Sequence, residues 1–167
     1  GQEPLYYNHQ PTGRPVAEGT KTFTKFTSTY FDVRNDALYP FGFGMSYTTF
    51  KYGDLRLSAD NMTRNDSIKA TITVTNTGNY DADEVVQLYI RDVVCSISRP
   101  VKELKGFRRI HLAKGESREV AFTITPDMLK FYNHNLDYVL EPGDFEVMAG
   151  PSSSNKDLNT KTFTVKF

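Results

Sequence analysis

From residue 51 to its end, the chain alternates apolar and polar side chains in short runs separated by turn residues. The clearest run spans residues 67–76, where four apolar residues alternate with lysine and threonine: Ile68, Ala70, Ile72 and Val74. Successive side chains of a β-strand point to opposite faces. The run therefore predicts a strand with one buried face and one exposed face.

Further runs of the same kind predict the remaining strands. Their apolar positions fall within residues 86–90, 104–110 (interrupted at Gly106), 120–124, 138–140, 145–149 and 163–167. Turn chemistry separates them at 76–79 and 114–116, a single helical turn is predicted at 126–129, and 151–159 is predicted to be a polar loop. Seven or eight short strands with no long helical pattern between them predict an all-β sandwich rather than a parallel α/β sheet.

The first fifteen residues do not share this alternation. They hold one short apolar run, Leu5-Tyr6-Tyr7, bracketed by prolines and a glycine. A lone strand of this length is not stable by itself. We therefore predict that this run completes a sheet belonging to another domain.

Residues 16–50 form a segment with no clear period, in which aromatic side chains gather toward the end. The members of interest are Tyr39, Phe41, Phe43 and Tyr47. The segment is too apolar for a free linker and too irregular for a helix. We predict an ordered crossover whose rings pack on neighbouring domains, with a sugar-stacking platform as the alternative.

Composition narrows the range of partners. The chain has 167 residues, of which 38% are hydrophobic, enough for a packed core. Lysine plus arginine equals aspartate plus glutamate at 20 each, which gives no electrostatic reason to expect a nucleic-acid or anionic-membrane partner. No apolar run approaches the roughly 20 residues that span a bilayer.

Three longer motifs occur along the chain, and together they carry a family resemblance. They are LYPFGFGMSYTTF (38–50), VTNTGNYDADEVVQLYI (74–90) and RPVKELKGF (99–107). In order and spacing they resemble the C-terminal region of family 3 glycoside hydrolases, which include β-glucosidases and β-xylosidases. The resemblance covers nearly the whole chain and is strongest to bacterial periplasmic β-glucosidases.

The resemblance implies a domain organisation. Residues 51–167 would form a fibronectin type III-like sandwich of the immunoglobulin type, 16–50 the crossover, and 1–15 the terminal piece of a preceding α/β-sandwich domain. The parent enzyme would hydrolyse terminal β-D-glycosidic bonds with retention, and it would be periplasmic or secreted. We expect the chain to be a fragment whose N-terminus lies upstream of Gly1.

Catalytic chemistry is not expected within this chain. In the resembling family the nucleophile is an aspartate of the first domain, and the acid/base comes from the second domain or an inserted loop. No residue here matches either motif. The densest acidic cluster, at 81–84, follows a turn and is interpreted as a solvated loop, with a calcium site or a catalytic pair as alternatives.

No cofactor or metal site is expected either. The three histidines lack metal-ligand spacing, and Cys95 is interpreted as a small buried thiol without a nearby base. As interdomain contacts the sequence offers Arg99, Pro100 and Arg14, together with the four crossover aromatics. An arginine can bridge to a carboxylate or carbonyl of a neighbouring domain, although Arg99 can equally be an ordinary surface residue.

The sequence thus predicts a non-catalytic accessory domain whose partners are the catalytic domains of the same polypeptide, with carbohydrate near the cleft as a further contact. A homo-oligomer is left open. The alternative is an autonomous β-sandwich module that binds carbohydrate or protein.

Overall fold

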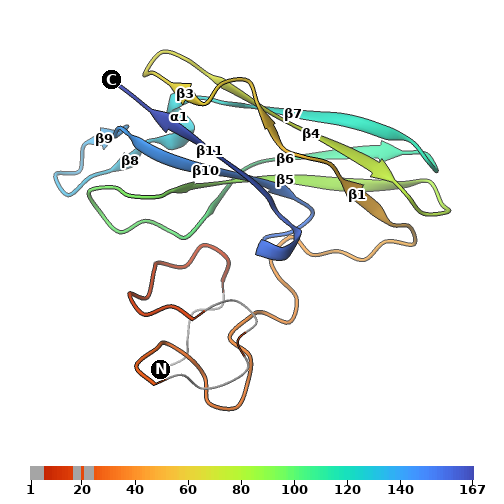
Figure 1. The fold of residues 1–167 in the computed structure, drawn as a ribbon, viewed down its shortest axis with the longest axis horizontal. Helices are drawn as coiled ribbons and strands as arrows, with labels where there is room; N and C mark the ends of the chain where they lie inside the picture. Colours follow the sequence, from red (N-terminus) through yellow and green to blue (C-terminus); the bar gives the residue numbers. More distant parts are fainter. Residues whose placement is uncertain (1–5, 17–19, 21–24) are drawn as a thin grey trace.

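The computed structural model describes residues 6–16, 20 and 25–167, and its main body is two β-sheets packed face to face (Figure 1). The described residues before Phe50 contain no helix or strand and lie on one side of the sandwich. Within the described part of the chain there are eleven strands, several only two or three residues long. The predicted all-β sandwich is confirmed.

The first sheet is built around β4 (Ile68–Asn76). Strand β7 (Ser117–Ile124) pairs antiparallel with it over eight residues. On the other edge of β4, β1 (Phe50–Tyr52) pairs near its end and β2 (Arg56–Leu57) near its start. The alternation in β4 therefore buries one face and leaves lysine and threonine on the outside.

The second sheet has five strands, in the order β3 (Asn61–Met62), β11 (Asn159–Val165), β10 (Gly143–Gly150), β5 (Ala82–Asp92) and β6 (Glu103–Leu112). All neighbours are antiparallel except β3 and β11. The longest strand, β5, lies between β10 and β6, so it is central to the sheet. This position matters for the site described below.

A small third unit extends from one end of the sandwich (Figure 1). The one-turn helix α1 (Pro126–Leu129) leads into β8 (Phe131–Tyr132), which pairs antiparallel with β9 (Tyr138–Val139). The predicted helical turn is confirmed at these residues. A 3₁₀ turn, η1 (Asn155–Asp157), lies in the loop before β11.

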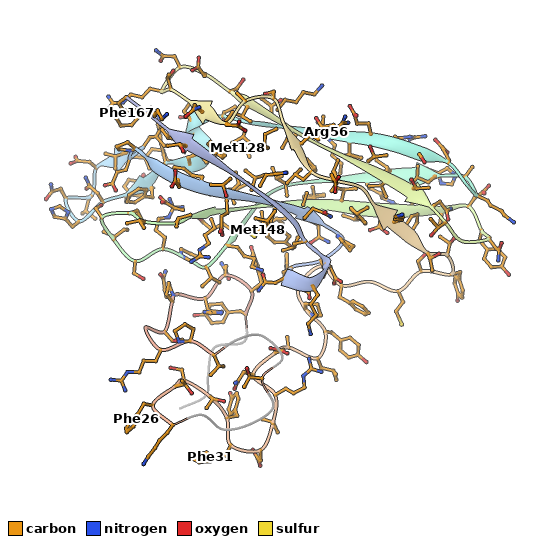
Figure 2. The ribbon with its side chains drawn as sticks, in the orientation of Figure 1. Phe26, Phe31, Arg56, Met128, Met148 and Phe167 are labelled. Carbon is orange, nitrogen blue, oxygen red and sulfur yellow. The ribbon has the colours of Figure 1, made fainter. Side chains whose placement is uncertain are left out.

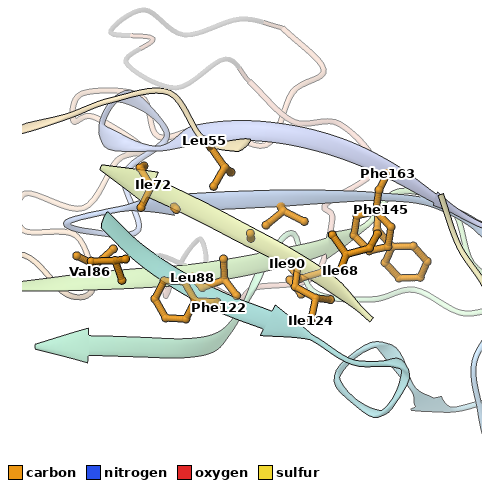
Figure 3. Close-up of a cluster of buried hydrophobic side chains, with 14 of the residues drawn as sticks. Leu55, Ile68, Ile72, Val86, Leu88, Ile90, Phe122, Ile124, Phe145 and Phe163 are labelled. Carbon is orange, nitrogen blue, oxygen red and sulfur yellow. The ribbon is translucent and has the colours of Figure 1, made fainter. Parts of the chain in front are cut away.

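The core lies between the two sheets and consists of the apolar positions that the alternation predicted (Figure 3). Its best buried members, each at most 1% exposed, include Ile68, Ile72, Val74, Val86, Leu88, Ile124, Phe163 and Val165. Burying one such side chain stabilises a fold by about 1.5–3 kcal/mol. The pattern in the sequence therefore coincides with the main source of stability.

The strand predicted at 104–110 is confirmed as part of β6, although its apolar side chains do not share one face. Phe107 is 67% exposed and Leu104 is half-buried, whereas Leu112 is fully buried. The register of β6 against β5 shifts between Leu88 and Tyr89, which marks a β-bulge. A bulge inserts one residue and changes which side chains face the core.

Tyr6 and Tyr7 lie in a turn and Leu5 lies outside the described residues, so pairing of this run with a sheet of another domain stays a prediction. Two smaller expectations differ. Phe167 follows the last strand, exposed beneath the Arg64 guanidinium, 3.7 Å from its ring centroid. The predicted polar loop contains two buried serines at 152–153, because the segment before Phe50 covers it.

Candidate functional site

Part of the outer face of the five-stranded sheet is covered by the described part of the segment before residue 50 (Figures 1 and 2). Gln87 and Tyr89 of β5 and Met148 of β10 alternate with core residues, so their side chains point away from the core. They are nevertheless only 4%, 0% and 5% exposed. Five consecutive residues of β5, 86–90, are buried, which requires cover on both faces. We call this contact the crossover interface.

Three aromatic rings form the apolar part of the crossover interface. The ring of Tyr7 stacks on Phe41, with centroids 4.3 Å apart and planes at 20°. The Tyr7 and Tyr89 rings meet edge to face, with their centroids 5.6 Å apart. Burial raises the pKa of Tyr89 well above its usual range. The Tyr89 hydroxyl is therefore held as a neutral hydrogen-bond donor.

Gln87 is the polar centre of the same interface. Its Nε2 donates to the carbonyls of Gly42 (3.1 Å) and Pro151 (2.6 Å), and its Oε1 accepts from the Tyr89 hydroxyl at 2.5 Å. Gly42 has φ +79°, and a Cβ placed there would lie 2.0 Å from Gln87 Oε1. A glycine is therefore needed at position 42 both for its backbone conformation and for the close approach.

Backbone hydrogen bonds fix the crossover at two further points. The Ser153 N–H donates to the Phe41 carbonyl and the Val101 N–H donates to the His9 carbonyl, each at 2.9 Å. Lys102, only 7% exposed, holds the first of these loops, because its Nζ donates to the Ser153 carbonyl at 2.8 Å. The interface is thus held by hydrogen bonds as well as by ring contacts.

A second anchor holds the end of the crossover. Thr48 donates from Oγ1 to Asn76 Oδ1 at 2.7 Å, and Thr77 N–H donates to the Thr49 carbonyl at 2.8 Å. Asn76 is fully buried and donates from Nδ2 to the Leu112 carbonyl at 3.1 Å. A single amide therefore joins the crossover, β4 and β6.

The other predicted crossover aromatics lie on the exposed side. Tyr39 and Phe43 are 70% and 48% exposed and their rings are 5.5 Å apart, so the structure brings these two together. Tyr47 is 96% exposed and stands apart from them. Further large apolar side chains of this segment are also exposed: Phe26, Phe31, Leu38 and Met45. Of the four predicted contact rings, Phe41 joins the crossover interface, through its stacking on Tyr7.

Arg99 is placed inside the sandwich unit. Its side chain is 9% exposed, pairs with Asp92 at 3.6 Å and with Glu103, and lies 4.8 Å from the Phe131 ring centroid. Burial raises the pKa of Asp92, although the Arg99 charge opposes the shift. These contacts make Arg99 a structural anchor, and an additional contact with another domain stays a prediction. Pro100 beside it is half-buried.

Arg14 is exposed, and its carbonyl accepts a hydrogen bond from the Ser28 N–H at 2.9 Å. That bond closes a loop within the segment before residue 50. An interdomain role for the Arg14 side chain likewise stays a prediction.

The acidic cluster at the start of β5 is engaged in local contacts. Asp83 accepts from His111 Nδ1 at 2.7 Å and from Arg109 Nε at 2.8 Å, which lowers the pKa of its carboxyl. Glu84 accepts from the Tyr52 hydroxyl at 3.0 Å, and burial raises its pKa. Adjacent strand residues point to opposite faces, so these two carboxylates do not face each other across one substrate site.

A cavity of about 240 Å³ lies beside the loop after β5, lined in part by Asp92, Cys95 and Arg99. The Cys95 thiol donates to the Ile97 carbonyl at 2.9 Å, and burial raises its pKa, which is the opposite of an activated nucleophile. Among the described residues, no three histidine, cysteine or acidic side chains gather as a metal site would need. Nor does that part of the chain include a helix of the length and apolar character that a membrane span requires.

Sequence reasoning missed Gln87, Tyr89 and Tyr7 as interface residues. The available signal was the apolar or large character of every residue from 86 to 90, which indicates a strand buried on both faces. At Gly42 the crossover backbone passes close to the Gln87 side chain.

Comparison with known proteins defines the class of domain first. Residues 84–153 match the Fn3-like family, described as the fibronectin type III-like domain. The matched segment runs from β5 through β10 and includes most of the crossover interface on the sandwich side. The chain therefore contains a fibronectin type III-like β-sandwich.

The relatives then place this sandwich within a particular family. The chain is 47% identical over 154 residues to a periplasmic β-glucosidase of Salmonella typhimurium and 42% identical over 166 residues to a β-xylosidase of Formosa agariphila. These alignments cover 92% and 99% of the chain, but only 20% and 22% of the relatives.

Solved structures agree with the sequence relatives. A mutant β-glucosidase from Listeria innocua in complex with laminaribiose matches 98% of the chain and 22% of its own length, at 39% identity and a TM-score of 0.88. In sequence and fold, this chain is the C-terminal region of the family 3 glycoside hydrolases, and it corresponds to their non-catalytic accessory domain.

Proposed function

We propose that the sandwich holds the crossover segment against the catalytic domains of a family 3 β-glucosidase-like enzyme and so stabilises them. The parent enzyme would hydrolyse terminal β-D-glycosidic bonds with retention, and the catalytic domains of the same polypeptide would be the partner. Because one relative is named a periplasmic β-glucosidase, a periplasmic or secreted location is part of the proposal.

The observation that carries this proposal is the two-sided character of the crossover. One side is fixed to the sandwich, because the Phe41 carbonyl accepts from the Ser153 N–H and the Gly42 carbonyl accepts from Gln87 Nε2. The other side presents Tyr39 and Phe43 to solvent. Soluble monomers rarely leave large contiguous apolar surface uncovered, so a segment rigidly held on one side and apolar on the other suits docking on a further domain.

The disposition of carboxylates supports the view that catalysis is supplied elsewhere. A retaining glycosidase needs two carboxyl groups about 5–5.5 Å apart across the scissile bond. Asp83 and Glu84 point to opposite faces of one strand, and each is bonded to a partner side chain. The acidic cluster therefore serves the sandwich rather than a substrate.

A complementation assay tests the proposal. The Salmonella relative would be prepared without the C-terminal region that this chain matches, then mixed with this chain and assayed for nitrophenol release from an aryl β-glucoside. We expect no turnover by this chain alone and restored turnover in the mixture. The paired Tyr39→Ser and Phe43→Ser substitutions should abolish restoration, whereas Tyr80→Ser, at an exposed tyrosine outside the crossover, should not.

Two results would contradict the proposal. Sustained turnover by the purified chain alone would mean that a catalytic pair lies within these residues. Absence of restoration, in an assay where the relative's own C-terminal fragment restores activity, would mean that the crossover does not dock as proposed.

A further inference from the structure

The hairpin formed by β8 and β9, residues 131–139, projects from the end of the sandwich and is not covered by the described segment before residue 50 (Figure 1). Its base is fixed, because Phe131 is 7% exposed and lies beneath the Arg99 guanidinium at 4.8 Å. A two-stranded hairpin is only marginally stable alone. The anchor at Phe131 therefore gives a rigid base to a unit that is otherwise exposed.

Two tyrosine rings lie side by side on this hairpin. Tyr132 and Tyr138 are direct cross-strand partners, with ring centroids 4.9 Å apart and planes at 41°. They remain 62% and 52% exposed. The Tyr138 hydroxyl donates to the Asp127 carbonyl at 3.4 Å and the Lys130 ammonium lies 5.8 Å from its ring, so this ring is held in place.

The loop between the strands has a defined shape. Asn133 Oδ1 accepts from the backbone N–H groups of Asn135 (2.9 Å) and Asp137 (3.0 Å), and the Asn133 N–H donates to the Asp137 carbonyl at 3.0 Å. Leu136 has φ +66°, a left-handed conformation that strains a non-glycine residue by about 1–2 kcal/mol. The loop accepts this strain, which fits a conformation kept for binding.

The loop also exposes polar side chains that are not used in hydrogen bonds to other described residues. His134, Asn135 and Asp137 are exposed, and their side chains make no hydrogen bond to any other described residue. They stand one to three residues from Tyr132 or Tyr138 in the chain. The hairpin thus combines two exposed tyrosine side chains with amide, imidazole and carboxylate groups that no other described residue binds.

This combination matches the chemistry of a sugar ring. A pyranose whose hydroxyls are all equatorial has flat C–H faces that pack on an aromatic ring and a rim of hydroxyls that need donors and acceptors. The exposed crossover rings differ, because their neighbours Leu38 and Met45 are apolar and suit a protein surface.

We propose that the hairpin 131–139 is a carbohydrate-binding site that takes an equatorial pyranose unit of a β-linked oligosaccharide. The stacking platform is Tyr132 and Tyr138, and Asn135 and Asp137 contact the hydroxyls. The inference rests on the proposed function only in the choice of β-linked sugars. The site would hold substrate chains near the enzyme rather than take part in hydrolysis.

Titration of the intact chain with laminaribiose and with xylobiose tests the inference, followed by amide chemical shifts in two-dimensional NMR spectra. We expect saturable shifts confined to 130–139, with a dissociation constant of about 1–10 mM. Tyr132→Ala and Tyr138→Ala should each weaken binding about tenfold. The control Tyr80→Ala removes a tyrosine of similar exposure, 64%, from another part of the sandwich and should leave the affinity unchanged.

Three outcomes would overturn the inference. They are the absence of saturable shifts up to about 50 mM sugar, affinity that survives both hairpin substitutions, and self-association that Tyr132→Ala abolishes without any sugar binding. The last result would make the hairpin a protein contact. Because the complementation assay depends on Tyr39 and Phe43 instead, restored activity without sugar binding would refute this inference and leave the proposed function standing.

Discussion

Replacing Asn76 by alanine should destabilise the sandwich more than most single polar substitutions. The Asn76 amide is 0% exposed and makes four side-chain hydrogen bonds. Its oxygen accepts from the Thr48 hydroxyl and the Gly78 N–H, and its nitrogen donates to the Tyr80 and Leu112 carbonyls, at 2.7–3.1 Å. The amide therefore uses both of its donor hydrogens and both acceptor positions of its oxygen.

The expected magnitude follows from the groups that lose their partner. The Leu112 carbonyl and the Thr48 hydroxyl belong to residues that are 0% and 8% exposed, so water does not readily replace the amide there. The Gly78 N–H and the Tyr80 carbonyl belong to half-buried or exposed residues and can be rehydrated. Leaving a buried polar group unsatisfied costs about 1–3 kcal/mol. Two such groups give about 2–6 kcal/mol, out of a total stability of about 5–15 kcal/mol.

Urea unfolding followed by tyrosine fluorescence measures this loss directly, since the chain has ten tyrosines and no tryptophan. With a slope of about 1–3 kcal/mol per molar urea, a loss of about 4 kcal/mol lowers the midpoint by about 1.3–4 M. Asn76→Asp should be at least as damaging, because a carboxylate cannot donate to either carbonyl.

The matched control is Asn79→Ala, an exposed asparagine in the same turn, which should change stability by at most about 0.5 kcal/mol. An Asn76→Ala chain within about 1 kcal/mol of the parent would refute the hydrogen-bond accounting.

Three other perturbations probe separate parts of the molecule. Gly42→Ala should release the crossover and speed proteolytic cleavage between 30 and 47, because its Cβ would overlap Gln87; Gly44→Ala, whose Cβ meets nothing within 4 Å, should not. Paired Tyr39→Ser and Phe43→Ser substitutions should reduce binding of an apolar dye by the isolated chain, and unchanged fluorescence would argue against an exposed docking patch. Because its partners lower the folded-state pKa of Asp83 below 3.8, the ionised carboxylate stabilises the fold above that pH and loses this effect as the pH falls through the folded pKa. Asp83→Asn should therefore flatten the acid side of a plot of urea midpoint against pH, and an unaltered profile would contradict the assignment.

Most of the sandwich could be predicted from the sequence because its strands are half-buried, and half-burial leaves a two-residue period. Strand β4 shows this plainly, with buried Ile68, Ile72 and Val74 between exposed or half-buried neighbours. The period fails where geometry is set by a bulge, as in β6, since nothing local announces the inserted residue. As a result Leu104 and Phe107, three positions apart, pair with Tyr89 and Gln87 of β5.

The candidate site was less predictable, for a different physical reason. A contact between residues 42 and 87 joins segments 45 positions apart, and neither residue carries a signal of the other. Arg99 shows the converse. Its position in a family motif suggested an outward bridge, whereas its charge is used by Asp92 and Glu103 within the sandwich unit. The charge of an arginine in the sequence does not indicate whether its partner lies in the same domain or in a neighbouring one.

Asn76 and Gln87 both hold the crossover, but only Asn76 also supports the core. Stability and docking of the crossover can therefore be tested separately. Asn76 joins the crossover at Thr48 but also holds β6 through Leu112, so its loss reaches the core. Gln87 meets Gly42 on the outer face of β5, whose inner face packs in the core independently of the crossover. Substitution of Gly42 should therefore free the crossover while the free energy of unfolding of the sandwich stays within about 1 kcal/mol of its original value. Loss of complementation by that folded variant would tie the activity of the assembled enzyme to crossover position rather than to sandwich stability.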